Sequence, residues 1–221
     1  MPVQAVNQND YNDSVADYVR GGWQVIDDTL YRLCREYPKH DDELSINAKV
    51  LLIGRTYTTG IERKIATRGT QGSSLSQVVD IFFQHHNEID RYFVHLRKVS
   101  EPLDPLKIRK MLMLHGLLVN LLRQLTIQKQ SVRTFISKYI HFHNPAVPIY
   151  DNIAANFLPS LVPLRKIKHF TIRPTTCADP EYVDYVRRFA ALYFASQSQA
   201  VTVRSLDYYL LYLKWKTCTQ A

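Results

Sequence analysis

Lys138 and Asp151 are the two residues in this sequence whose types and spacing could support covalent chemistry. Lys138 lies in a helical pattern whose apolar face is formed by other residues, namely Val132, Phe135, Ile136, Tyr139, Ile140 and His143. The pattern breaks at Asn144–Pro145, and Asp151 then stands where the next helix should begin. A helix advances about 7.5 Å from Lys138 to His143 at 1.5 Å per residue, and an extended segment of seven residues can retrace that distance. We therefore expect Asp151 to return beside Lys138.

The chemistry of such a pair follows from its two groups. A buried lysine loses proton affinity and can act as a neutral amine nucleophile. A carboxylate held at a helix N-terminus can stabilise positive charge that develops on a sugar. The competing interpretation is a solvated helix lysine and an aspartate that only caps a helix. If the chemical interpretation holds, the Nζ of Lys138 and a carboxylate oxygen of Asp151 should face one concavity, roughly 4–8 Å apart.

Helical periodicity extends along almost the whole chain, whereas alternating strand patterns are nearly absent. We predict an all-α fold of about 8–10 helices over residues 1–221, as a single domain or two closely packed lobes, with residues 1–10 as a polar tail. Three sets of residues are predicted to form buried helix faces. They are Trp23, Ile26, Leu30, Leu33 and Cys34; Leu44, Ala48, Leu51 and Leu52; and Leu206, Tyr209, Leu210 and Leu213.

Composition and charge narrow the class of protein. The formal net charge is +8 and the isoelectric point is about 9.4, which favours a polyanionic partner, most often nucleic acid. No apolar run approaches a membrane span, and Cys34, Cys177 and Cys218 lack metal-ligand spacing. We interpret them as reduced thiols of a cytoplasmic protein. His141 and His143 fall on different helix faces, so no metal and no cofactor is expected.

The stretch TFISKYIHF…NPAVPIYDNIAANFL resembles the core of helix-hairpin-helix DNA glycosylases, especially the 8-oxoguanine group and its archaeal branch. In the resemblance Lys138 matches the lysine that forms a Schiff base, and Asp151 matches the carboxylate that assists it. Pro148 and Ile149 match the segment that leads into that aspartate. The resemblance implies excision of a damaged or modified base from duplex DNA, with possible cleavage at the abasic site.

The sequence departs from the family at the hairpin. The Lys–Asp separation is shorter than the family usually shows, and LTIQKQSVRTF replaces the glycine-rich turn that presents backbone N–H groups to a phosphate. If the hairpin binds DNA, Lys129, Ser131 and Arg133 would have to supply the contacts.

Further candidate residues surround the pair, with a cleft expected near residues 129–173. His141, Phe142 and Tyr150 are expected to line a substrate pocket. Arg165, Lys166, Lys168 and Arg173 cluster in PLRKIKHFTIRP, either as a phosphate-contacting rim of that pocket or as a solvated basic loop. Arg55 and Tyr57 lie in IGRTYTTGIER, which either packs between lobes or supplies a stacking residue for DNA.

Three functions remain open at this point. The first is a lysine-dependent DNA glycosylase with lyase activity, which the presence of both Lys138 and Asp151 favours. The second is a non-catalytic nucleic-acid-binding module of a defence or regulatory system, which the missing glycine turn favours. The third is a helical protein-interaction domain. The sequence does not identify the base or any protein partner.

Overall fold

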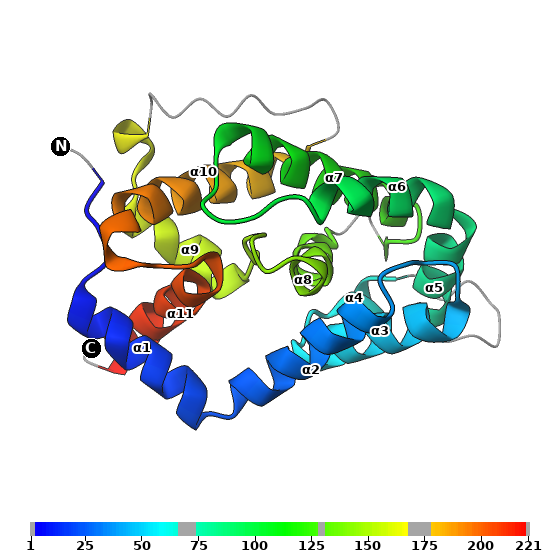
Figure 1. Ribbon diagram of the computed structural model, residues 1–221, viewed down its shortest axis with the longest axis horizontal. Helices are drawn as coiled ribbons and strands as arrows, with labels where there is room; N and C mark the ends of the chain where they lie inside the picture. The colour runs from blue at the N-terminus through cyan, green and yellow to red at the C-terminus, as the bar shows by residue number, and fades with distance from the viewer. Residues whose placement is uncertain (1–2, 66–73, 128–130, 168–177, 220–221) are drawn as a thin grey trace.

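The computed structural model describes residues 3–65, 74–127, 131–167 and 178–219 (Figure 1). These residues form an all-α fold, as predicted, in which the only β-type pairing described is an isolated bridge between Ile65 and Thr126. The α-helices are α1 Gln8–Arg20, α2 Trp23–Glu36, α3 Glu43–Thr56, α4 Ile61–Lys64, α5 Ser74–Gln84, α6 His86–Leu96, α7 Pro105–Arg123, α8 Arg133–His143, α9 Asn152–Leu161, α10 Pro180–Ala195 and α11 Val203–Thr219. Two short 3-10 helices, η2 Leu164–Lys166 and η3 Gln197–Gln199, complete the described elements. None of the described helices has the length and apolar character to cross a lipid bilayer.

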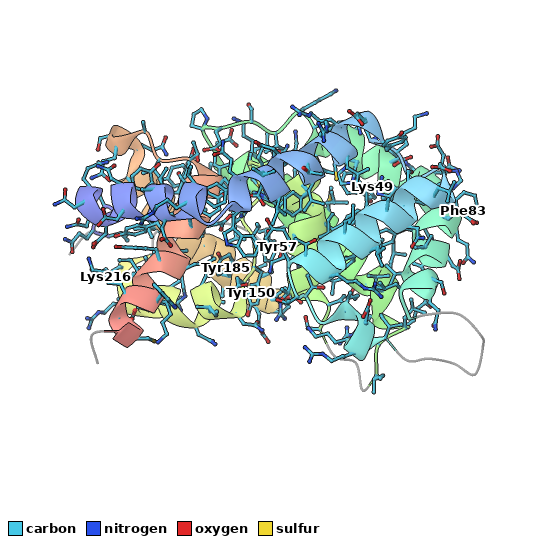
Figure 2. All side chains as sticks on the ribbon, turned by 90° about the horizontal axis from the view of Figure 1, so that it is seen from below. Lys49, Tyr57, Phe83, Tyr150, Tyr185 and Lys216 are labelled. Carbon is cyan, nitrogen blue, oxygen red and sulfur yellow. The ribbon has the colours of Figure 1, made fainter. Side chains whose placement is uncertain are left out.

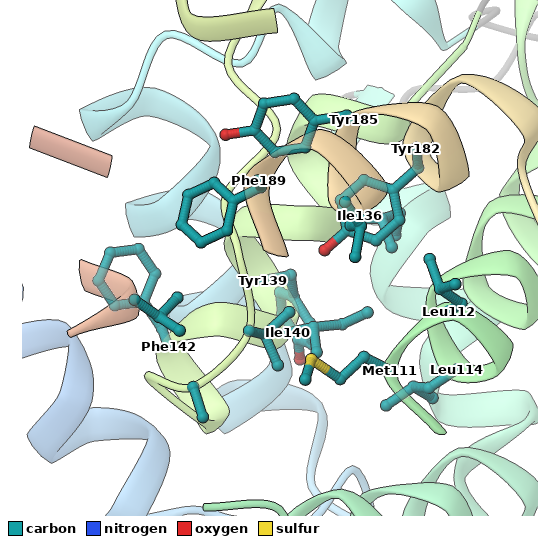
Figure 3. Close-up of a cluster of buried hydrophobic side chains, with 14 of the residues drawn as sticks. Met111, Leu112, Leu114, Ile136, Tyr139, Ile140, Phe142, Tyr182, Tyr185 and Phe189 are labelled. Carbon is teal, nitrogen blue, oxygen red and sulfur yellow. The ribbon is translucent and has the colours of Figure 1, made fainter. Parts of the chain in front are cut away.

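Helix α8 occupies the centre of the molecule, where it contacts α2, α3 and α7 (Figure 1). Every residue from Phe135 to Phe142 is buried, including the polar ones, which is why the apolar pattern of α8 does not by itself reveal its orientation. Figure 3 shows buried side chains of α8, α7 and α10 gathered in one cluster. The contributing side chains are Ile136, Tyr139, Ile140 and Phe142 of α8, Met111, Leu112 and Leu114 of α7, and Tyr182, Tyr185 and Phe189 of α10.

The segment predicted as a polar tail is instead packed against the C-terminal helices. Val6 is buried, and its backbone N–H donates to Ser196 Oγ at 3.0 Å. The Asn7 N–H donates to Tyr209 Oη at 3.1 Å, and the Asn7 side chain caps α1. Helix α1 then lies along α11. The two ends of the described chain are therefore held together, and this pairing builds one wall of the site.

The buried face of α3 also differs from the prediction. Leu44 and Leu52 are exposed, whereas Ile46, Lys49 and Ile53 are fully buried. Lys49 can be buried because its Nζ donates to two backbone carbonyls, those of Tyr37 at 2.9 Å and Lys39 at 2.8 Å. The sequence pattern was misleading because it counted Lys49 as polar and so rotated the apolar face.

Candidate functional site

Lys138 and Asp151 lie beside each other, with 3.4 Å between Lys138 Nζ and Asp151 Oδ2. This separation is shorter than the roughly 4–8 Å expected from the sequence. Asp151 is the N-cap of α9, and its other oxygen, Oδ1, accepts the Ile153 N–H at 2.8 Å. The carboxylate is thus oriented by the helix terminus while one oxygen remains directed at the amine.

The return of the chain from α8 to Asp151 is fixed by Asn144, the C-cap of α8, and by Ser137 within the helix. Asn144 ends the helix, and its Nδ2 donates to the carbonyls of Leu96 and Val99 at 2.7 and 2.8 Å. Ser137 Oγ accepts the Tyr150 N–H at 2.9 Å, one residue before Asp151. These bonds replace the backbone partners that an extended segment lacks, so the short connection adopts one defined path.

Burial is the main influence on the ammonium of Lys138, which is 4% exposed. Desolvation lowers the pKa of Lys138, while the nearby Asp151 carboxylate acts in the opposite direction. The Nζ also donates to the Tyr57 carbonyl at 3.3 Å and lies 5.2 Å from the centre of the Tyr57 ring. The amine therefore loses its proton more readily than an exposed lysine does, yet it keeps a carboxylate to receive that proton.

The pair lies in the wall of a cavity of about 600 Å³. The wall combines residues from α1, the start of α2, the end of α3, α8, α9 and α11, which are far apart in the sequence. Aromatic rings contribute much of it, including Trp23, Tyr57, Tyr208 and Trp215. The predicted cleft segment, residues 129–173, supplies one side of the cavity, and the helices at the two ends of the chain supply most of the rest.

A buried aspartate ties three of these elements together. Asp27 in α2 is 1% exposed and accepts hydrogen bonds from the phenols of Tyr18, Tyr57 and Tyr208. Arg204 of α11 pairs with the same carboxylate through Nε, at 2.8 Å, and through Nη2. This cluster fixes Tyr57, whose carbonyl accepts from Lys138, and it satisfies a charge that would be costly to bury alone.

His141, Phe142 and Tyr150, which were expected to line the pocket, are not part of the described lining of the cavity. His141 is fully buried and bridges the Val147 carbonyl (Nδ1, 2.6 Å) and the Tyr31 phenol (Nε2, 2.5 Å). It therefore helps to hold the segment that returns to Asp151. Phe142 packs against Tyr57 with ring centroids 5.3 Å apart. Tyr150 instead lies beneath Arg133, whose guanidinium is 5.0 Å from its ring centre.

Of the residues expected to bind DNA, those that the structure describes are not part of the cavity lining. Arg133 is committed to two carboxylates, because its guanidinium contacts Asp179 at 2.6 and 3.0 Å and Glu181 at 2.5 Å. Ser131 bonds within its own turn and accepts from Lys64 through its carbonyl. Arg165 and Lys166 lie in η2, away from the described cavity lining. Lys129, Lys168 and Arg173 lie outside the described residues.

Several residues of the cavity were missed because they were assigned to the core. Trp23 was predicted to be buried, but it is 44% exposed and lines the cavity. Helix α11 has two faces: Leu206, Tyr209 and Leu210 are buried, as predicted. The second face was not recognised, and it presents Arg204, Asp207, Tyr208, Leu211 and Trp215 to the cavity. Their spacing of three or four residues is the signal that could have identified this face.

Comparisons of the chain with protein-family models, with curated proteins and with solved structures found no match.

Proposed function

We propose that this protein is a DNA glycosylase with lyase activity, which excises a damaged or modified base from duplex DNA through a Schiff base on Lys138. The observation that carries the proposal is the Lys138–Asp151 pair, 3.4 Å apart in the wall of a large cavity. A structural ion pair needs no such cavity, whereas an amine that attacks a substrate does.

Lys138 supplies the nucleophile. Its burial favours the neutral amine, and the amine attacks C1′ of the damaged nucleotide as the bond from C1′ to the base breaks. The base departs with the bonding electrons and takes a proton from water. The new secondary ammonium then loses a proton to Asp151. The C1′–O4′ bond then breaks, with O4′ taking the proton back from Asp151, and an imine forms between C1′ and Nζ. Loss of a C2′ proton to water and departure of the 3′ phosphate then cleave the strand.

Asp151 supports this step without leaving its helix. One oxygen remains bonded to the Ile153 N–H, so the carboxylate keeps its position throughout the reaction. The other faces the reacting amine and the sugar carbon, where positive charge develops as the base departs. An amide at this position would keep the cap and lose the charge.

The cavity suits a nucleotide that has left the DNA helix. A base in the stack cannot reach a lysine that is almost fully buried, so the nucleotide must be extrahelical. The cavity volume, about 600 Å³, falls within the range for pockets that enclose a ligand of this size. Trp23 and Trp215 in the lining are flat aromatic rings of the kind on which a base stacks.

The test is reductive trapping of the imine. Duplexes that carry an abasic site, 8-oxoguanine or a modified cytosine are incubated with protein and borohydride, and the covalent complex is resolved by denaturing electrophoresis. We expect cross-linking to the abasic duplex at least, and its loss in Lys138→Gln, because glutamine has no nucleophilic amine. Asp151→Asn should keep its cap and slow trapping by about 100-fold or more.

Two matched variants control for the loss of a lysine and of a helix-capping aspartate elsewhere in the protein. Lys98→Gln replaces an exposed lysine that is not part of the described cavity lining, and Asp42→Asn alters another aspartate that caps a helix, at α3. Both should trap as the wild type does. Equal trapping by the wild type and Lys138→Gln would refute the role of Lys138. If the wild type binds DNA in a salt-sensitive way but is not trapped on any of the duplexes, the protein is a non-catalytic binding module instead.

A further inference from the structure

Tyr57 contacts the amine of Lys138 through both its backbone and its side chain. The Lys138 Nζ donates to the Tyr57 carbonyl at 3.3 Å. It also lies over the Tyr57 ring, 5.2 Å from the ring centre, which is close enough for the ring face to attract a cation. Both contacts favour positive charge on Nζ, and both come from a residue of the cavity lining.

The Tyr57 carbonyl can reach the amine because it lies at the end of a helix. Tyr57 is the C-cap of α3, and the last carbonyls of a helix have no partner in a following turn. The next residue, Thr58, has a φ of 44°, in the left-handed region that β-branched residues rarely adopt. This strained residue follows α3 at the point where the Tyr57 carbonyl meets Nζ. The negative end of the helix dipole therefore lies beside the amine.

The Tyr57 ring is held in place by contacts with other side chains. Its hydroxyl donates to Asp27 Oδ1, and Asp27 is itself buried and paired with Arg204. The ring packs against Phe142, with centroids 5.3 Å apart, and against Trp23, with centroids 5.9 Å apart. These contacts give the ring a fixed position beside Nζ.

Among the described residues, the Nζ of Lys138 has two hydrogen-bond acceptors, as many as a neutral amine has hydrogens. Asp151 Oδ2 lies 3.4 Å from Nζ, and the Tyr57 carbonyl lies 3.3 Å from it. When each hydrogen of the neutral amine is directed at one acceptor, the lone pair is left for attack on C1′. The secondary ammonium that forms next again carries two hydrogens, so the same two acceptors suit it.

We propose that Tyr57 is a catalytic residue that orients the Lys138 amine and stabilises the positive charge that Nζ carries during the reaction. This inference rests on the proposed function. The hydrogen directed at Asp151 leaves the secondary ammonium, and Asp151 passes it to O4′ as the C1′–O4′ bond breaks. The hydrogen directed at the Tyr57 carbonyl stays on nitrogen, so the imine forms in its protonated, cationic state. Tyr57 itself neither gains nor loses a proton.

Such stabilisation accelerates the reaction because the attacking amine is neutral. A carbonyl and an aromatic face interact weakly with a neutral amine and much more strongly with a cation. The extra interaction therefore appears only as Nζ bonds to C1′, which lowers the barrier. Asp27 has a positioning role, since it acts through the Tyr57 hydroxyl.

The role of the ring is tested with fluorinated phenylalanines at residue 57, which keep the shape of the ring and weaken the negative charge on its face. Tyr57→Phe and its 3,5-difluoro and 3,4,5-trifluoro forms are trapped with borohydride on a preformed abasic duplex under single-turnover conditions. We expect the trapping rate to fall with each step of fluorination, by about tenfold in total. The same fluorinated residues in place of Phe83 of α5, which lies apart from Tyr57 in Figure 2, should leave the rate unchanged.

The role of the carbonyl is tested with a backbone ester. The α-hydroxy acid analogue of threonine at Thr58 makes the Tyr57 carbonyl that of an ester, which is a weaker acceptor. It also removes the Thr58 N–H, which donates to the Arg55 carbonyl at 3.1 Å. The matched control is the same replacement at Thr59, whose N–H donates to the Gly54 carbonyl at the same distance. We expect abasic trapping to slow about tenfold for the Thr58 ester and by less than about threefold for the Thr59 ester.

The possible results separate this inference from the proposed function. A trapping rate that does not depend on the number of fluorines would overturn the role of the ring, since a merely structural ring would give that result. Equal rates for the two esters would overturn the role of the carbonyl. In both cases the wild type would still be trapped on the abasic duplex, and the proposed function would stand. Absence of abasic trapping by the wild type would show instead that the proposed function is wrong, and the inference with it.

Discussion

Lys49 and Lys138 are two lysines buried in the same molecule, and they differ in what surrounds the amine. Burial lowers the pKa of both, to about 8 for Lys49. Lys49 is closed in, with its ammonium bonded to the carbonyls of Tyr37 and Lys39. Lys138 faces Asp151 and a cavity. In Figure 2, Lys49 lies apart from Tyr57, the residue that marks the cavity beside Lys138.

A lowered pKa is therefore insufficient evidence for catalysis, since a structural lysine has one as well. The two lysines differ in whether a cavity gives access to the amine and in which group lies beside it. Backbone carbonyls cannot accept a proton from Lys49, whereas the Asp151 carboxylate can accept one from Lys138. Two predictions test this contrast, and the one with the larger expected effect comes first. A third concerns Asp207, a buried carboxyl group beside Lys138.

The reactivity of the two amines should differ by more than an order of magnitude. Reductive methylation with formaldehyde and borohydride modifies neutral amines that the reagent can reach. Lys138 lies in a cavity wall and should be methylated, whereas Lys49, with no exposed surface, should react only through unfolding. Peptide mass spectrometry at pH 8 over a time course measures both sites in one sample. Comparable rates at the two lysines would remove the distinction.

Truncation of Lys49 should lower the free energy of unfolding more than truncation of Lys138. Lys49→Ala removes a fully buried stem and two hydrogen bonds, so we expect a loss of about 3 kcal/mol in the free energy of unfolding. Lys138→Ala opens into an existing cavity and should cost about 1 kcal/mol. Urea unfolding followed by circular dichroism gives both values. A larger loss for Lys138→Ala would mean that its pair with Asp151 is chiefly structural.

Asp207→Asn should stabilise the protein, and the effect should grow with pH. Below pH ~4 the carboxyl is neutral in both the folded and the unfolded chain, so the substitution changes little. Above that pH the unfolded chain ionises, while the folded protein retains its proton until its raised pKa is reached. The wild type therefore loses stability across this window, and asparagine does not.

We expect a gain on the order of 1 kcal/mol near pH 8 for Asp207→Asn. Thermal unfolding of the variant and the wild type at pH 4, 6 and 8 measures it. Asp42→Asn should show no such gain, because hydrogen bonds from the first turn of α3 lower the pKa of Asp42, so that its ionisation stabilises the folded protein. A gain in stability that did not vary with pH would indicate that Asp207 is ionised in the folded protein.

The sequence was informative where the relevant contacts are local. The Lys138–Asp151 pair could be predicted because a helix, a proline break and a helix start lie close together along the chain, so geometry limits where Asp151 can go. The helices themselves followed from the spacing of apolar residues. The chemistry proposed for the pair still awaits the trapping experiment.

The tertiary structure decided what faces the pair. Asp27, Arg204 and Asp207 come from opposite ends of the chain and meet only because α1 and α2 fold beside α11. Periodicity shows that a helix has an apolar face, but it does not show whether that face meets the core or a cavity, which is why Trp23 was misassigned. The burial of Lys49 and the engagement of Arg133 by Asp179 depend likewise on partners distant in sequence or on the folded path of the chain. Local sequence determined the Lys138–Asp151 pair, and long-range packing determined its surroundings.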